Sequence, residues 1–138
     1  MYKKILIALA LDQGYGKRAV ELARRIGSDD VEIIAAHVID HVPAFSRVYA
    51  GDIDKDEIIK KVKESIVSRV GDIGDIQPVV LEGHAGRTVT DYANKIGADC
   101  IICGAHHPGL SDFFLGSTAA RIMRYAKCSV HILRLSES

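Results

Sequence analysis

Short apolar runs alternate with amphipathic stretches along the whole chain of 138 residues. The amphipathic stretches repeat their apolar residues at spacings of three and four, as one face of a helix does. Unbroken alternation of strands and helices predicts an α/β fold, in which right-handed crossovers join the strands into one parallel sheet. The predicted strands are residues 5–11, 31–39, 76–83, 98–103 and 129–135, and the predicted helices are 19–26, 56–70, 89–96 and 117–126.

Two features refine this pattern. Pro78 lacks an N–H group for a sheet ladder, so we expect the third strand to lie at an edge of the sheet. Residues 40–54 form a long connection after the second strand, and long loops in small domains are more often functional than idle.

Length and charge limit the function classes. We expect residues 1–138 to form a single domain with a substantial core. The 18 basic and 18 acidic residues balance, so no net charge recruits nucleic acid or an anionic membrane. No apolar run reaches the roughly 20 residues of a membrane span, and no signal peptide is recognisable at the start. The odd count of 3 cysteines argues against a disulfide framework. We therefore expect a cytoplasmic protein.

The strand at 98–103 leads into a loop bounded by glycines. Gly104 ends the strand, and Gly116 and Ser117 open the last helix. A strand, a glycine loop and a helix start present unpaired backbone N–H groups and a positive dipole end to an anion. We expect Ser117 to cap the helix and to offer its hydroxyl to a phosphate oxygen. The alternative is a connection in which the glycines only make turns.

The whole stretch resembles the C-terminal nucleotide-binding signature of the universal stress protein family. Gly104 and Gly116-Ser117 match its two ends, and the form Gly-x-His-x-Pro at 104–108 resembles small single-domain members of the family. The middle glycine of the signature is absent here. The ending 124–134 is also similar to the family's, so the resemblance covers nearly the whole chain.

The resemblance implies a Rossmann-like parallel sheet of five strands in the order 3-2-1-4-5, with helices on both faces. Ligands of such sheets bind at the carboxyl ends of the strands, where the strand order reverses. It implies an adenine nucleotide site at strand ends and around the glycine loop, made by Ala8, Leu9, Ala10, Asp12, Val38, Gly83, Cys103, Gly104, His106, His107, Gly109, Gly116, Ser117 and Thr118.

Some of these positions carry specific expectations from the family. ATP-binding members usually have an Asp at the position of Ala10, and Asp12 either substitutes for it or is a plain loop residue. The backbone of Val38 would read the adenine edge. His107 stands where Arg is frequent, which makes the charge there depend on pH. Gly116, Ser117 and Thr118 would hold the phosphates.

The resemblance implies ATP as the ligand, with AMP or ADP as alternatives and Mg²⁺ as counter-ion to the phosphates. No protein metal site is expected, because His106 and His107 lack further partners at ligand spacing. Cys100 and Cys103 spell C-x-x-C, but residues three apart in a strand face opposite sides, so we interpret both as core residues and reject a redox pair.

No Walker motif, nucleophile elbow or paired carboxylates occur, so we expect no enzyme beyond slow ATP hydrolysis or self-phosphorylation on Ser117. The hypothesis is an ATP-binding regulatory or protective module of the stress response. The alternative is the same fold without ATP binding, acting as a dimeric protein-interaction module; an enzyme with adenylate chemistry would need catalytic residues that we do not find. Residues 129–135 form an apolar strand that the implied order puts at an open edge, where it would pair with a second copy of the chain.

Overall fold

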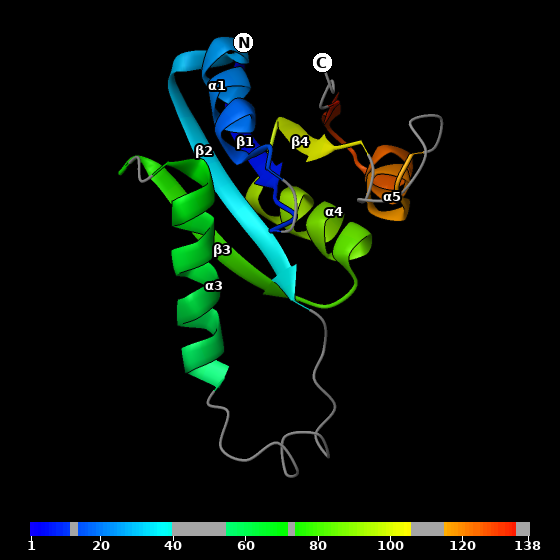
Figure 1. Cartoon of the computed structure of the whole chain (residues 1–138). Coiled ribbons are helices and arrows are strands. Elements are labelled where there is room, and N and C mark those ends of the chain that lie inside the picture. Colours follow the sequence, from blue (N-terminus) through cyan, green and yellow to red (C-terminus); the bar gives the residue numbers. More distant parts are fainter. Residues whose placement is uncertain (12–13, 40–54, 72–73, 106–114, 135–138) are drawn as a thin grey trace.

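The fold is an open, all-parallel sheet of five strands in the order β3-β2-β1-β4-β5. The computed structural model describes residues 1–11, 14–39, 55–71, 74–105 and 115–134 (Figure 1). The predicted α/β class and strand order are confirmed. The strands are β1 (Tyr2–Ala8), β2 (Gly27–Ile39), β3 (Ile76–Glu82), β4 (Cys100–Gly104) and β5 (Ser129–Leu133), and the helices are α1 (Gly16–Ile26), α3 (Lys55–Val70), α4 (Ala85–Ile96) and α5 (Ser117–Tyr125).

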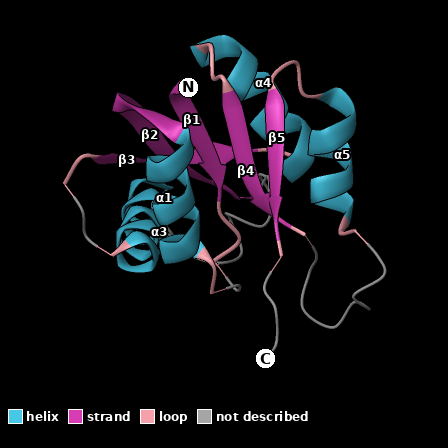
Figure 2. Cartoon of the chain, turned by 90° about the horizontal axis from the view of Figure 1, so that it is seen from above, coloured by secondary structure: helices cyan, strands magenta, loops and turns pink. Residues whose placement is uncertain are grey.

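Two cores lie on the two faces of the sheet. On one face, Ile5 and Ile7 of β1 pack with residues of α1 and α3; on the other, Leu6 and Ala8 pack with residues of α4 and α5. Figure 2 shows the sheet between these two pairs of helices. Because both faces of β1 are covered, its sequence is continuously apolar rather than alternating.

The two cysteines of the C-x-x-C sequence lie in the core, as predicted. Cys100 lies in the core beneath α1 and α3, and Cys103 in the core beneath α4 and α5. Only 1% and 3% of their surfaces are exposed. Side chains on opposite faces of a strand cannot approach one another to form a disulfide.

All five strands are observed with boundaries that differ from the predicted ones, most clearly in β1 and β2. β1 ends at Ala8 rather than at residue 11, because the Tyr15 hydroxyl donates to the Ala8 carbonyl (2.6 Å) and accepts from the Ala10 N–H (3.2 Å). β2 begins at Gly27, directly after α1, and Gly27 already pairs with Tyr2. The predicted strand 129–135 is observed as Ser129–Leu133, and residue 135 and the loop 40–54 lie outside the described residues.

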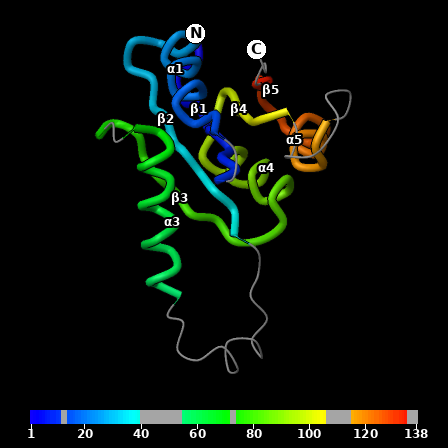
Figure 3. Tube along the Cα trace, viewed as in Figure 1, coloured from blue at the N-terminus to red at the C-terminus, as the bar shows by residue number. Residues whose placement is uncertain are grey.

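The order of the strands places β1 in the middle of the sheet and β3 and β5 at its edges. Figure 3 shows β1, in blue, between β2 in cyan and β4 in yellow. Pro78 lies on β3, as predicted for an edge strand. The chain therefore passes from β1 through β2 to β3 on one side of the sheet, and from β4 to β5 on the other, so the order reverses between β1 and β4.

Gly16 of α1 packs closely against the backbone of α3. A Cβ atom at this position would lie 2.6 Å from the Arg69 carbonyl oxygen and 3.0 Å from the carbonyl carbon. We expect Gly16→Ala to destabilise the fold, because overpacking against backbone costs about 1–3 kcal/mol, more than the roughly 0.5–1 kcal/mol that alanine gains over glycine in a helix. Urea unfolding would show a lower midpoint at an unchanged slope.

Gly14→Ala is the matched control, because a Cβ atom there meets nothing within 4 Å. Its unfolding midpoint should equal or exceed that of the wild type. A Gly16→Ala variant as stable as the Gly14→Ala variant would contradict this account of the contact between α1 and α3.

Candidate functional site

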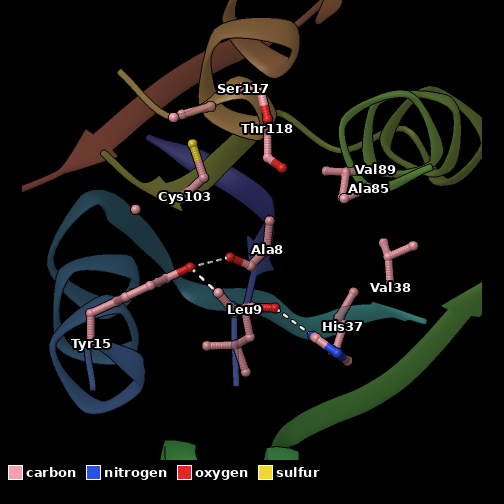
Figure 4. A pocket seen from close by; sticks show the side chains of 15 residues that line it. Ala8, Leu9, Tyr15, His37, Val38, Ala85, Val89, Cys103, Ser117 and Thr118 are labelled. Atoms are coloured by element: carbon pink, nitrogen blue, oxygen red, sulfur yellow. Dashed lines mark hydrogen bonds between the residues drawn. The ribbon is translucent and has the colours of Figure 1, made fainter. Parts of the chain in front are cut away.

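A pocket of about 160 Å³ lies at the carboxyl ends of the central strands, where the strand order reverses. Such a reversal opens a crevice, because the crossovers on either side leave toward opposite faces of the sheet. Figure 4 shows Ser117 and Thr118 on one side of Ala8, and His37 and Val38 on the other. The lining residues are Ala8, Leu9, Ala10, Tyr15, Ala36, His37, Val38, Ala85, Val89, Cys103, Gly104, Gly116, Ser117, Thr118 and Ala119.

The start of α5 forms one wall of the pocket. The first hydrogen bond within this helix runs from the Ala120 N–H to the Gly116 carbonyl (2.9 Å). The N–H groups of Ser117, Thr118 and Ala119 therefore have no partner within the helix. All three residues line the pocket, so their N–H groups and the positive end of the helix dipole lie beside it.

The prediction that Ser117 caps this helix was wrong. Gly116 occupies the N-cap position and no side chain caps the helix, whereas Ser117 is the first helical residue. The Gly116 N–H donates to the Ala105 carbonyl (2.8 Å) and so is not available to an anion. Ser117 and Thr118 are exposed, which leaves their hydroxyls and N–H groups as the polar groups of this wall.

The end of β2 forms the opposite wall, and its hydrogen bonds show which neighbouring strand each backbone group faces. The Ala36 carbonyl accepts a hydrogen bond from the Leu9 N–H (2.8 Å), and the Ile39 carbonyl accepts one from the Gly83 N–H (3.0 Å). Ala36 therefore faces β1 and Ile39 faces β3. Since backbone groups alternate along a strand, Val38 also faces the β1 side. The last residue of β1 that pairs with β2 is Ala8, opposite Ala36, so the N–H and C=O of Val38 face the crevice.

Tyr15 and His37 hold the strand ends that form the floor. Tyr15 is 2% exposed, and its hydroxyl bridges the backbone of Ala8 and Ala10. His37 Nδ1 lies 2.8 Å from the Leu9 carbonyl oxygen. A carbonyl oxygen can only accept, so Nδ1 carries a proton and donates this hydrogen bond. Both side chains fix residues 8–10 where β1 leaves the sheet.

The described lining contains no Asp, Glu, Lys or Arg. An anion in this pocket would therefore be bound by backbone N–H groups, hydroxyls and the helix dipole rather than by an opposing side-chain charge. Burial raises the pKa of the Cys103 thiol to about 11, so this side chain is a neutral, apolar surface at physiological pH.

The pocket brings together most of the residues that the resemblance implied. They are Ala8, Leu9, Ala10, Val38, Cys103, Gly104, Gly116, Ser117 and Thr118. Gly83 is not among the lining residues; it turns the chain after β3 at a φ of 140°, two residues before Ala85, which does line the pocket. Asp12, His106, His107 and Gly109 lie outside the described residues.

Several lining residues were not predicted from the sequence, namely Tyr15, Ala36, His37, Ala85, Val89 and Ala119. His37 and Ala119 adjoin predicted site residues, and Ala36 lies two positions before Val38, so their proximity was a usable signal. Tyr15 gave none, because its role depends on hydrogen bonds to the end of β1 that exist only in the fold.

Among the described residues, no group of three or more His, Cys, Asp or Glu side chains could hold a metal ion. No helix in the described part of the chain is both long and apolar enough to cross a membrane.

The fold and site define a doubly wound α/β protein with a ligand pocket at the switch point of its sheet. Residues 1–134 match the universal stress protein family, and the chain belongs to this family. Universal stress protein A homolog 2 of Coxiella burnetii is 31% identical over 144 residues, covering 99% of this chain and 98% of the relative.

Solved structures show the same fold. A universal stress protein in complex with cAMP aligns with a TM-score of 0.62 at 22% identity, over 98% of each chain. A universal stress protein family protein from Arabidopsis thaliana with AMP bound aligns with a TM-score of 0.62 at 17% identity, over 97% of this chain and 92% of that one.

The buried cysteines should be unreactive. Burial raises the pKa of the Cys100 and Cys103 thiols to about 11, and it also raises the pKa of Cys128, but Cys128 is only half-buried and therefore more accessible. Since the thiolate is the nucleophile, iodoacetamide at pH 8 should modify only Cys128 in the native protein, and all three thiols in urea. The readout is the mass of the intact protein.

Cys128→Ser is the control and should acquire no native adduct at pH 8. Because the raised pKa keeps the buried thiols protonated until the pH approaches 11, while unfolded thiols ionise near 9.0, native protection should persist at pH 9. Rapid native modification of either buried cysteine, or a disulfide between the two, would overturn their assignment to the core.

Proposed function

We propose that this protein binds an adenine nucleotide, ATP foremost, in the switch-point pocket and acts as a nucleotide-responsive regulatory or protective module in the cytoplasm. One observation carries the proposal: the N–H groups of α5 that have no partner within the helix and the Val38 backbone that faces the crevice line the same pocket, one from a helix and the other from a strand. Relatives of the same fold solved with cAMP and with AMP support an adenine nucleotide as the ligand class.

The start of α5 suits the phosphates. Three N–H groups without helical partners, two exposed hydroxyls and the helix dipole provide hydrogen-bond donors and positive potential without a side-chain cation. Mg²⁺ fits as a counter-ion held by phosphate and water, because the described lining offers it hydroxyls but no carboxylate. The proposed contacts also include Asp12, His106, His107 and Gly109, which lie outside the described residues.

The end of β2 suits adenine. A backbone N–H and C=O side by side complement the N1 acceptor and the N6 amino donor of that base, whereas guanine carries an acceptor at position 6. The apolar residues Ala36, Val38 and Val89 line the same region and would cover the ring. At about 160 Å³ the described pocket is smaller than the roughly 300–1,000 Å³ typical of ligand sites, so a nucleotide would extend beyond it.

The proposed role is regulatory rather than catalytic. The described lining pairs no carboxylates for acid–base chemistry, and any turnover would be slow hydrolysis or phosphorylation of Ser117. The second candidate is a protein-interaction module that binds no ATP. It is favoured by Ala10, which stands where ATP-binding members carry an acid and which lines the pocket as a small apolar residue.

Nucleotide binding should stabilise the fold. A ligand at one hundred times its dissociation constant adds about 2.7 kcal/mol, which raises Tm by several degrees for a domain of this size. We expect ATP to produce this shift and GTP to produce less, because guanine presents mismatched groups to Val38. Mass spectrometry of the ligand released from purified protein identifies the native nucleotide.

Ser117→Asp tests the phosphate wall without weakening the helix. A carboxylate in the first turn interacts favourably with the helix dipole, so the variant without ligand should keep its stability. The same charge repels phosphate and should weaken ATP at least about tenfold. Gln77→Glu, which adds the same charge at an exposed position near the amino end of β3, is the control and should leave binding intact. Equal binding by both variants would move the phosphates away from α5, and no shift with any adenine nucleotide would favour the second candidate.

We also propose that the protein forms a homodimer through β5. The Leu133 carbonyl accepts the Ala105 N–H (3.0 Å), so Leu133 and His131 face β4. By alternation, the backbone groups of Val130 and Ile132 face outward at the edge. Two such edges would satisfy one another in an antiparallel pair about a two-fold axis.

Ile132→Pro should yield a monomer, because proline removes an outward-facing N–H without removing a hydrogen bond to β4. Light scattering at tens of micromolar is the measurement, with circular dichroism to verify the fold. A monomeric wild type would refute the dimer, and a dimeric proline variant would place the contact on another surface.

A further inference from the structure

The outer surface of α4 and α5 carries a groove of about 780 Å³ that is separate from the switch-point pocket. The two helices cover one face of the sheet side by side (Figures 1 and 2). A Cβ atom on Gly86 would lie 2.7 Å from Arg121 Cβ and 3.4 Å from the Thr118 carbonyl oxygen, so the helices meet closely at the base of the groove. We call this surface the basic groove.

The charge of the basic groove is one-sided. Arg87, Arg121, Arg124 and Lys127 line it, against the single carboxylate of Asp91. Within the part of the chain that the structure describes, one ion pair involves these cations, from Arg87 Nε to Asp91 Oδ2 at 3.9 Å, and both of its side chains are highly exposed. The whole chain has no net charge, so this concentration of positive charge is local to the two helices.

A second surface groove on α3 shows that this imbalance is not general. It encloses about 520 Å³, and its lining balances Lys60 and Lys63 against Asp56 and Glu64. Two helical grooves of similar kind thus differ in charge balance, which makes the α3 groove a natural control.

We propose that the basic groove binds an acidic polypeptide segment that also carries an apolar residue. Three of the four cations are arginines, whose planar guanidinium groups pair with carboxylates through two parallel hydrogen bonds. Tyr125 gives the groove an aromatic surface for the apolar residue. Its side chain is 60% exposed, and the Arg124 guanidinium carbon lies 5.7 Å from the centroid of its ring.

Several features favour a polypeptide over a nucleic acid. α5 has 9 residues and spans roughly 14 Å, which matches about four residues of extended peptide. Thr90 and Asn94 add polar groups that can hydrogen-bond to the peptide backbone. Nucleic-acid binding draws on many phosphate contacts and a basic footprint, whereas this chain is neutral overall.

The test is fluorescence anisotropy with a labelled Glu-rich peptide that contains leucine, measured at low and at physiological salt. The matching Gln-rich peptide should bind far more weakly, and added salt should weaken the Glu-rich peptide. The variant Arg121→Glu/Arg124→Glu should lose at least about tenfold in affinity. Lys60→Glu/Lys63→Glu makes the same change of charge in the α3 groove and should bind as the wild type does.

Several outcomes would overturn the proposal. They are no binding of the Glu-rich peptide by the wild type, equal loss in both double variants, or tighter binding of a single-stranded oligodeoxynucleotide of equal charge, which would identify a nucleic acid instead. If ATP, at concentrations that saturate the wild-type protein, displaces the peptide, the cations of the basic groove would belong to the nucleotide site instead. If Arg121→Glu/Arg124→Glu does not fold by circular dichroism, Arg124→Glu/Lys127→Glu, which leaves Arg121 against Gly86, replaces it with the same expected loss.

Discussion

The departure of the chain from the sheet after its last hydrogen bond to β2, from the Leu9 N–H to the Ala36 carbonyl, is the constraint on which the site depends. The Tyr15 hydroxyl accepts a hydrogen bond from the Ala10 N–H and donates one to the Ala8 carbonyl, while His37 donates one to the Leu9 carbonyl. These hydrogen bonds stabilise a chain that has left the ladder. Because β1 ends there, the Val38 backbone is left facing a crevice, and the start of α5 is close enough to line it.

α5 connects two surfaces of the molecule. Its first residues, Ser117 and Thr118, line the switch-point pocket, and its outer face contributes Arg121 and Arg124 to the basic groove. Its inner face buries Ala119 and Ile122 against the sheet. A nucleotide at the start of this helix and a peptide on its outer face would therefore act on the same nine-residue element. Under the proposed function, this shared helix would couple the nucleotide to the peptide.

The fold could be predicted well because its determinants are local. Continuous apolar runs and helical stripes indicate the elements, and the strand order came from the resemblance to the family. The boundaries of β1 and β2 were less accurate, because they depend on Tyr15 and on the pairing of Gly27 with Tyr2, which are contacts between distant positions. Glycine spacing located the start of α5 but did not show that Gly116, rather than Ser117, is the N-cap.

Part of the pocket lining was expected before the fold was known. Ala8, Val38 and Cys103 were expected from the resemblance to the family, which implies a site at strand ends, and all three line the pocket. The direction of a backbone N–H depends on register, and the role of a side chain such as Tyr15 depends on which chain segment it meets. Neither can be derived from spacing along the chain.

The central claim is that one ligand contacts the start of α5 and the end of β2 at the same time. Titration of the isotope-labelled protein with AMP, followed by amide chemical shifts, tests it most directly. The account predicts that the N–H signals of Ser117, Thr118, Ala119 and Val38 move together along one saturating curve, while those of Gly14 and Lys63 stay in place. Shifts confined to α5, to the basic groove or to no described residue at all would contradict it.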